Sequence, residues 1–278
     1  MLTKKTIGFL GAGNLAEALI KGLISSRSVA PGHIVAADRM SERLIHMAEV
    51  HEVKVFSRNF EAVRSSDIIF LTVKPQDALG VLAEIAPEAV QGQLLISVAA
   101  GITTASIMEA LKDAGLKHFM PIVRAMPNTP ATVREAATAI CAGPGAGTGH
   151  LELAAALFST VGAVTVIEDE SLMDAVTGLS GSGPAYVFLF MEALIEAGVK
   201  LGLASDTAKA LAMQTVLGAA KYAIDSRKDL GELRRMVTSP GGTTMAGLKK
   251  LDEGGFCEII EKAVEAATKR AKELSAGK

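Results

Sequence analysis

The chain has 278 residues, which at about 150 residues per domain predicts two domains. With 49% hydrophobic and 21% charged residues it has the composition of a globular protein, which excludes a disordered, collagen-like or coiled-coil chain. The net charge of −2 argues against a broad basic face for nucleic acid or anionic lipid, and an aromatic content of 4% argues against a surface that stacks bases. We therefore expect neither nucleic acid nor a membrane as a partner, and any anionic ligand must be held locally.

The first part of the chain alternates short apolar runs with helical patterns. The runs that predict strands are 6–10, 33–38, 54–56, 67–73 and 93–99, with at least two more among 121–127, 137–143 and 163–168. The patterns that predict helices are 15–24, stretches starting at 41 and 59, 75–85, and 103–111. This alternation predicts a doubly wound α/β sheet, and we assign residues 1–168 to a Rossmann-like domain.

The remainder of the chain, 169–278, predicts only helices and is assigned to an all-α domain. The expected helices are 171–179, 184–201, 205–224, 230–237, 243–251 and 256–274, separated by turn signals such as SGSGP and SPGG. The longest uncharged stretch, 175–191, is interrupted by glycines and Pro184, so it is interpreted as a helix end followed by a buried helix rather than a membrane span. Because the N-terminus also lacks the apolar run of a signal peptide, a cytoplasmic protein is expected.

Cysteine and histidine usage predicts no metal centre. Cys141 and Cys257 are far apart and have no ligand-like spacing, so both are expected to be buried, reduced thiols. No spacing typical of metal ligands or of a general base is found among the histidines, which are His33, His46, His51, His118 and His150. The sequence therefore offers no obvious catalytic histidine or cysteine.

The string GAGNLA at 11–16 is the strongest local signal. It follows a predicted strand, opens a predicted helix and matches the pattern G-x-G-x-x-A. Gly11 would permit the tight turn, Gly13 would let a pyrophosphate approach the backbone, and Ala16 would let the helix pack closely on the strand. We predict dinucleotide binding here; the alternative is a glycine turn that serves packing only.

The end of the second predicted strand bears on which nicotinamide cofactor is bound. Asp38 would accept hydrogen bonds from ribose hydroxyls and repel a 2′-phosphate, whereas Arg39 and Ser41 would attract one. The two interpretations conflict unless Asp38 turns outward or caps the following helix. NADPH is the expected cofactor, with NADH also possible.

Three further places in the chain could contact a ligand. Lys74 and the stretch 97–101 end predicted strands at the edge where α/β proteins bind ligands, although a solvated lysine and a plain turn would look the same. The segment SPGGTT at 239–244 offers free backbone N–H groups and two hydroxyls at a helix start, which suit a carboxylate. The alternative for this segment is a capped turn between helices.

Several motifs together resemble pyrroline-5-carboxylate reductases, the enzymes of the last step of proline synthesis. They are GFLGAGNLAEALIKG, VKPQ, SVAAG, MPNTP, LSGSGPAYVF and SPGGTTMAGLKKLDEGGF, and the resemblance runs from about residue 6 to 274. It implies an NAD(P)H-binding domain followed by a helical substrate-binding and dimerisation domain. It also implies dimers that assemble further, expected here as a decamer.

The resemblance implies one set of cofactor residues and one set of substrate residues. The cofactor would be lined by Gly11, Gly13, Asn14, Leu15, Asn59, Val73, Lys74, Pro75, Ala99, Ala100 and Gly101, in addition to Arg39 from the argument above. The substrate would be held by Ser239, Gly241, Gly242, Thr243, Thr244 and Glu170, with Thr244 at the ring nitrogen. The implied reaction is hydride transfer from NAD(P)H to 1-pyrroline-5-carboxylate, giving L-proline. A different imine or 2-oxoacid reductase, and a non-enzymatic NADPH-sensing protein, are the alternatives.

Overall fold

The computed structural model describes residues 5–275, which form two compact units. The first unit contains the described residues up to Ser182 and those from Ala266 onward, and the second is Gly183–Glu265. This division differs from the sequence-based boundary between 168 and 169. The reason is that the residues just after 168 pack on the sheet of the first unit, where Met173 is fully buried in a cluster with strand residues.

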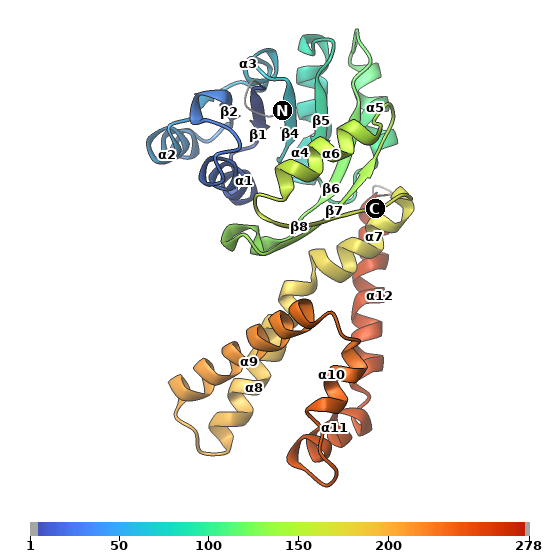
Figure 1. Ribbon diagram of the computed structural model, residues 1–278. Helices are drawn as coiled ribbons and strands as arrows, with labels where there is room; N and C mark the ends of the chain where they lie inside the picture. Colours follow the sequence, from blue (N-terminus) through green and yellow to red (C-terminus); the bar gives the residue numbers. More distant parts are fainter. Residues whose placement is uncertain (1–4, 276–278) are drawn as a thin grey trace. The chain divides into compact units, whose positions relative to one another are not determined.

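The first unit is built on one eight-stranded sheet with the order β3-β2-β1-β4-β5-β6-β7-β8 (Figure 1). The strands are β1 (Ile7–Leu10), β2 (Ile34–Ala37), β3 (Lys54–Phe56), β4 (Ile68–Leu71), β5 (Leu94–Ser97), β6 (Ile122–Met126), β7 (Ala136–Ala142) and β8 (Gly162–Val166). Neighbouring strands are parallel except β6 and β7, which pair antiparallel. The strand order reverses between β1 and β4, and the carboxyl ends of such strands form the crevice in which open α/β sheets bind ligands.

Helices cover both faces of this sheet. They are α1 (Asn14–Ser25), α2 (Ser41–His51), α3 (Asn59–Arg64), α4 (Pro75–Ile85), α5 (Thr104–Asp113) and α6 (Thr148–Phe158), with short 3₁₀ turns η1 (Pro31–His33), η2 (Ala86–Glu88), η3 (Thr129–Val133) and η4 (Glu170–Leu172). Phe9 and Phe70 stack in the apolar cluster that includes residues of α1 and α6. Leu10 and Leu71 lie in the opposite cluster, with residues of α3, α4 and α5. Burial on both faces is why these strands are almost continuously apolar in the sequence.

The predicted α/β architecture of this unit is confirmed, with two local differences. Most observed strands are shorter than the predicted runs, because only the central residues of each run make ladder hydrogen bonds; β4, for example, ends at Leu71 rather than Val73. The helix α6 was not among the predicted elements. It begins inside the glycine-rich run 143–149, which has the composition of a loop.

The second unit consists of helices. They are α8 (Gly183–Lys200), α9 (Ser205–Ser226), α10 (Leu230–Met236), α11 (Thr243–Glu253) and the first half of α12 (Phe256–Ser275). The predicted interruption at SGSGP is found at Ser182. Before it, α7 (Met173–Val176) runs into the π-helical turn η5 (Thr177–Gly181), which ends at Ser182, and α8 begins at Gly183.

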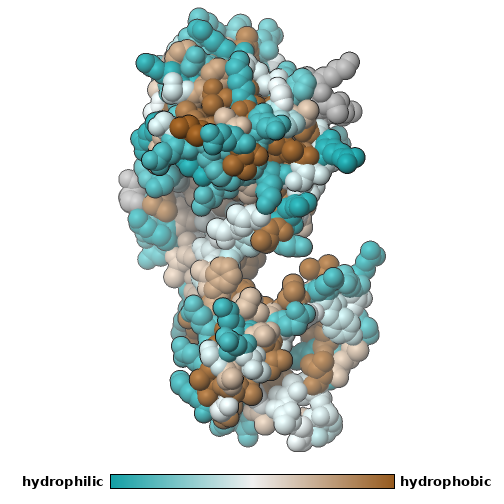
Figure 2. Space-filling model, turned by 90° about the vertical axis from the view of Figure 1, so that its left-hand side faces the viewer, coloured by the Kyte–Doolittle hydropathy of each residue, from teal (hydrophilic) through white to brown (hydrophobic). Residues whose placement is uncertain are grey.

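Much of the apolar surface of the second unit is exposed (Figure 2). No residue of α8 is buried, so the expectation of a buried helix is wrong for the single chain; Leu189 is 66% exposed. By length and composition the helical run Glu170–Lys200 could cross a membrane, and only 6% of its apolar window is buried. An apolar face of this extent needs a covering partner.

Candidate active site

The glycine loop between β1 and α1 has the shape that the sequence predicts. Gly11 adopts a φ of +100°, and a Cβ atom there would lie 2.9 Å from the backbone nitrogen of Val73, so only glycine fits without strain. The Gly11 N–H donates to the carbonyl of Ala37 at 2.8 Å, which joins the loop to β2. Gly13 serves a different purpose, because a Cβ atom at this position would meet no atom within 4 Å. The open side of the loop therefore lies at Gly13.

The N-terminus of α1 is suited to an anion. Gly13 is its N-cap residue and supplies no side-chain hydrogen bond to the helix. The first N–H groups of a helix lack intrahelical partners and carry the positive end of the helix dipole. A pyrophosphate placed against Gly13 would meet these N–H groups directly, which is how dinucleotides are held on this type of sheet.

Polar side chains hold the loop from both sides. The Asp38 carboxylate accepts hydrogen bonds from the N–H of Ala12 at 2.7 Å and from the N–H of Met40 at 2.9 Å. The Arg43 Nε donates to the carbonyl oxygen of Ala12 at 2.8 Å. The Asp38 carboxylate therefore holds the loop in place. The Arg39 side chain, by contrast, is 83% exposed, and its Nη1 lies 3.7 Å from Asp77 Oδ1. Arg39 therefore lies exposed at this edge, where it forms an ion pair with Asp77.

A cavity of about 460 Å³ adjoins the start of α1. It brings together three residues that the sequence analysis placed at the cofactor: Asn14, Leu15 and Ala100. The other lining residues were not predicted and are Ala18, Met126, Pro127, Asn128, Thr129, Ala131, Thr132, Thr177, Gly181 and Ser182. Most of them belong to the motifs MPNTP and SGSGP, which carried the family resemblance but had been given no role.

Asn128 fixes the wall of this cavity. Its Nδ2 donates to the carbonyl of Ser180 and its Oδ1 accepts from the N–H of Ala137, each at 3.0 Å. One side chain therefore connects η3, β7 and the π turn. The two motifs that line the cavity are held together by this amide.

The remaining predicted cofactor residues lie along the same sheet edge. Lys74 is the N-cap of α4, and it is exposed together with Pro75, while Val73 is half-buried. The Asn59 amide donates to Glu84 Oε2 at 2.7 Å at the start of α3. Ala99 is buried, and Gly101, two residues later, has a φ of +73°.

Gly101 also has a structural purpose that the sequence did not reveal. A Cβ atom at this position would lie 3.0 Å from the Cβ of Leu274 and 3.3 Å from the nitrogen of Ser275. The C-terminal end of α12 therefore packs directly on the turn after β5. Within the first unit, this glycine makes room for the returning helix.

The predicted substrate segment lies in the second unit, before α11. Gly241 has a φ of +70°, and Gly242 is the N-cap of α11 with no side-chain hydrogen bond to the helix. The N–H of Gly242 donates to the carbonyl of Ser239 at 3.0 Å, which closes the turn. Thr243 and Thr244 form the first turn of the helix, where backbone N–H groups lack intrahelical partners. Binding of a carboxylate at this turn stays a prediction.

Glu170 is engaged within the first unit. Its Oε1 accepts hydrogen bonds from the Thr104 N–H at 2.8 Å and from Arg124 Nη1 at 3.0 Å, and its Oε2 accepts one from the Thr104 hydroxyl at 2.5 Å. The Arg124 side chain is only 2% exposed. Both carboxylate oxygens of Glu170 therefore stabilise the packing of α5 and β6, and its predicted contact with substrate stays a prediction.

The two cysteines differ from each other. Cys141 is buried, and burial together with the nearby Glu170 charge raises the pKa of its thiol to about 11, which keeps the thiol protonated at neutral pH. Cys257 is exposed in the single chain, so the expectation that both thiols are buried holds only for Cys141.

Two family models match the chain. Residues 170–274 match "Pyrroline-5-carboxylate reductase dimerisation", and residues 6–101 match "NADP oxidoreductase coenzyme F420-dependent". A glycine loop at the crevice of a doubly wound sheet, followed by a helical unit of this kind, defines an NAD(P)H-dependent oxidoreductase.

Known proteins resemble the chain over nearly its whole length. The pyrroline-5-carboxylate reductase of Pseudomonas aeruginosa is 43% identical over 97% of this chain and 96% of its own length. A pyrroline-5-carboxylate reductase structure from Coxiella burnetii is 39% identical, with a TM-score of 0.91 over 98% of this chain and 99% of that chain. The Plasmodium falciparum pyrroline carboxylate reductase, solved with NADP bound, is 31% identical, with a TM-score of 0.86 over 99% of this chain and 100% of that chain. The chain belongs to the pyrroline-5-carboxylate reductase family.

Family membership confirms the predicted fold, reaction and nicotinamide cofactor. The residues present fit such a cofactor, because the space at Gly13 is open and the start of α1 has no side-chain cap. The dimerisation match covers α8 and α9, whose apolar side chains are exposed in the single chain. Self-association therefore accounts for the exposed apolar surface.

Proposed function

We propose that this chain reduces 1-pyrroline-5-carboxylate to L-proline by hydride transfer from NAD(P)H to C5 of the cyclic imine, the final step of proline biosynthesis. The observation that carries the proposal is the glycine loop with its adjoining cavity, in a chain that matches pyrroline-5-carboxylate reductases from end to end. Oxidation of NADPH or NADH with 1-pyrroline-5-carboxylate, compared with Δ1-piperideine and pyrroline-2-carboxylates, tests it. Turnover of only the other imines would overturn it.

The proposed roles follow from the chemistry of each residue. When bound, NAD(P)H supplies the hydride. The N–H groups after Gly13 hold the pyrophosphate, and Asn14, Leu15 and Ala100 line the adjoining cavity. A protonated imine is already electrophilic, so the main task of the protein is to orient two flat rings at reacting distance.

The substrate carboxylate is assigned to the segment 239–244. Backbone N–H groups at the start of α11 and the positive end of its dipole favour an anion. The Thr244 hydroxyl hydrogen-bonds the ring nitrogen and orients it, rather than acting as an acid, because a hydroxyl proton is too weakly acidic for that role.

Replacing Thr244 by alanine is expected to lower kcat/KM for 1-pyrroline-5-carboxylate ten- to a hundredfold. The loss corresponds to about 1.4 to 2.7 kcal/mol, the usual cost of one polar contact in a desolvated site. Steady-state kinetics of Thr244→Ala and Thr244→Ser measure it, and the serine variant should retain most of the activity. Thr165→Ala, on an exposed position of β8, is the matched control. Unchanged kinetics in Thr244→Ala would remove the residue from the site.

Replacing Arg39 by alanine is expected to raise KM for NADPH by about fivefold to tenfold and to leave KM for NADH nearly unchanged. A guanidinium recognises a 2′-phosphate, which NADH lacks, and one exposed charge-assisted hydrogen bond contributes about 1 to 1.5 kcal/mol. Kinetics with both cofactors on the same variant provide the internal control. Equal effects on the two cofactors would show that Arg39 does not contact the 2′-phosphate.

The assembly and location are also proposed. The chain forms dimers through its helical unit, the dimers assemble into a decamer, and the protein works in the cytoplasm without a nucleic-acid or membrane partner. The exposed apolar side chains of α8 and α9 support association, and the net charge of −2 speaks against an anionic surface as partner. Analytical ultracentrifugation of the purified protein in the absence of detergent tests both the oligomer and its solubility.

A further inference from the structure

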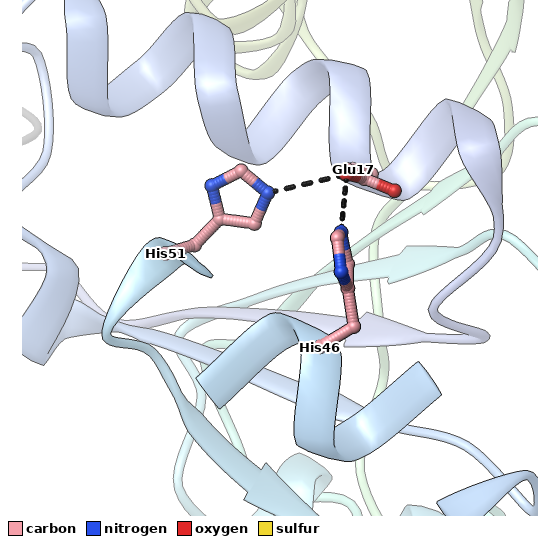
Figure 3. A group of neighbouring side chains, drawn as sticks. All are labelled: Glu17, His46 and His51. Carbon is pink, nitrogen blue, oxygen red and sulfur yellow. Dashed lines mark hydrogen bonds and ion pairs between the residues drawn. The ribbon is translucent and has the colours of Figure 1, made fainter. Parts of the chain in front are cut away.

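Three half-buried side chains with metal-ligating atoms meet between two helices of the first unit. Glu17 lies on α1, and His46 and His51 lie on α2 (Figure 3). Glu17 Oε1 is 2.7 Å from His46 Nε2 and 3.4 Å from His51 Nε2. Both imidazole rings thus point at the same carboxylate oxygen, although 29 and 34 residues separate them from Glu17.

The arrangement has the size of a metal site. The three ligand atoms lie within 4.8 Å of one another. A tetrahedral zinc ion binds nitrogen and oxygen ligands at about 2.0 to 2.2 Å, which places the ligand atoms roughly 3.3 Å apart. Small rotations of the three side chains away from the observed hydrogen bonds give this spacing. Each imidazole Nε2 then binds the metal ion in place of its hydrogen bond, and the proton of the ring resides on Nδ1.

The cluster is partly accessible, although the His51 side chain is only 10% exposed. The side chains of Glu17 and His46 are 27% and 39% exposed, so an ion can enter and keep a water as its fourth ligand.

We infer that Glu17, His46 and His51 form a binding site for a divalent transition-metal ion of the zinc type. Two imidazole nitrogens and one carboxylate oxygen are ligands that suit Zn²⁺, Co²⁺, Ni²⁺ or Cu²⁺, whereas Mg²⁺ and Ca²⁺ prefer all-oxygen sites. The Arg43 Nη2 lies 2.6 Å from Glu17 Oε2 and retains that contact while Oε1 binds the ion. Its positive charge weakens the affinity, so we expect micromolar rather than nanomolar binding.

The site is a connection between helices and not part of the reaction centre. It joins α1 to α2, and Arg43 connects it to the glycine loop, because Nε of Arg43 donates to the Ala12 carbonyl and Nη2 donates to Glu17. A bound ion should therefore raise the melting temperature and steady the glycine loop. It should not be required for turnover, because none of its ligands lines the cavity beside α1.

The test uses the purified, chelator-treated wild-type protein and CoCl₂ or ZnCl₂ as probes. We expect visible absorption bands of four-coordinate Co²⁺, a binding isotherm for one Zn²⁺ per chain, and a rise in melting temperature with Zn²⁺. Wild-type protein that gives none of these signals at 100 micromolar ion, a concentration of about a hundred times the expected Kd, would overturn the proposal.

Variants locate the ion. His46→Gln, at a partly exposed position, should weaken Zn²⁺ binding by about tenfold or more. His118→Gln removes an exposed histidine outside the cluster and should bind Zn²⁺ like the wild type. Equal binding by wild type and His46→Gln, or equal loss in both variants, would show that the ion binds elsewhere. Turnover without added metal should persist in every variant, so failure of the metal site and failure of the proposed reaction are distinguishable.

Discussion

Replacing Gly13 by valine is expected to leave the fold intact and to weaken NADPH binding by about a hundredfold or more. The backbone of Gly13 is extended, with φ −74° and ψ −176°, and a Cβ atom there meets no atom within 4 Å. Valine is therefore tolerated in the apo protein, but its methyl groups occupy the space beside the first N–H groups of α1. The pyrophosphate can then no longer approach these N–H groups closely, and the binding free energy of NADPH falls by about 2.7 kcal/mol or more.

Valine substitutions at two other glycines serve as comparisons for Gly13→Val. Gly32→Val places the same side chain in open space outside the loop and should bind NADPH normally. Gly11→Val, by contrast, forces a side chain into a positive φ and against Val73, so it should lose stability as well as binding. Fluorescence titration with NADPH and thermal melts separate the three outcomes. Normal binding by Gly13→Val would mean that the pyrophosphate does not lie on this loop.

Features encoded by neighbouring residues were predictable. The apolar run around Phe70 and the glycine pattern at 11–16 each reflect constraints within a few residues, namely burial on two faces and a turn that needs positive φ. The same holds for α4, whose Pro75 start and Ile85 end were predicted and observed. Local signals of this kind are also the basis on which a dinucleotide site is predicted at the carboxyl edge of the sheet.

Features that depend on distant contacts were not predictable. The cavity wall is fixed by Asn128, which bonds residues 52 and 9 positions away, and no periodicity signals such a contact. The spacing of His46 and His51 is not a ligand pattern in itself, and only the packing of α2 beside α1 brings them to Glu17. The exposed apolar face of α8 misled the sequence analysis for a related reason: a helix covered by a second chain and a helix buried in its own chain have the same composition.

Replacing Glu170 by glutamine is expected to destabilise the protein by about 3 kcal/mol, the effect of removing one partner from a buried ion pair. Arg124 is 2% exposed, and among the described residues its Nε and Nη2 atoms have no hydrogen-bond partner. Glu170 supplies the negative charge nearest to the Arg124 guanidinium, because Glu170 Oε1 lies 3.0 Å from Nη1 whereas Asp174 Oδ1 lies 3.8 Å from Nη2. A neutral amide would retain an acceptor for Thr104 but leave the guanidinium charge largely uncompensated.

Chemical denaturation and kinetics of the same variant decide what Glu170 does. A structural role predicts lower stability, with KM for 1-pyrroline-5-carboxylate within about twofold of the wild type. Glu109→Gln, an exposed carboxylate on α5, should change neither quantity. If Glu170→Gln is instead as stable as the wild type and its KM for the substrate rises tenfold, the carboxylate acts on the substrate. In that case the hydrogen bonds of Glu170 to Thr104 and Arg124 describe only the protein without its ligand. In the variant, the charge of the buried Arg124 guanidinium would be balanced by the Asp174 carboxylate alone.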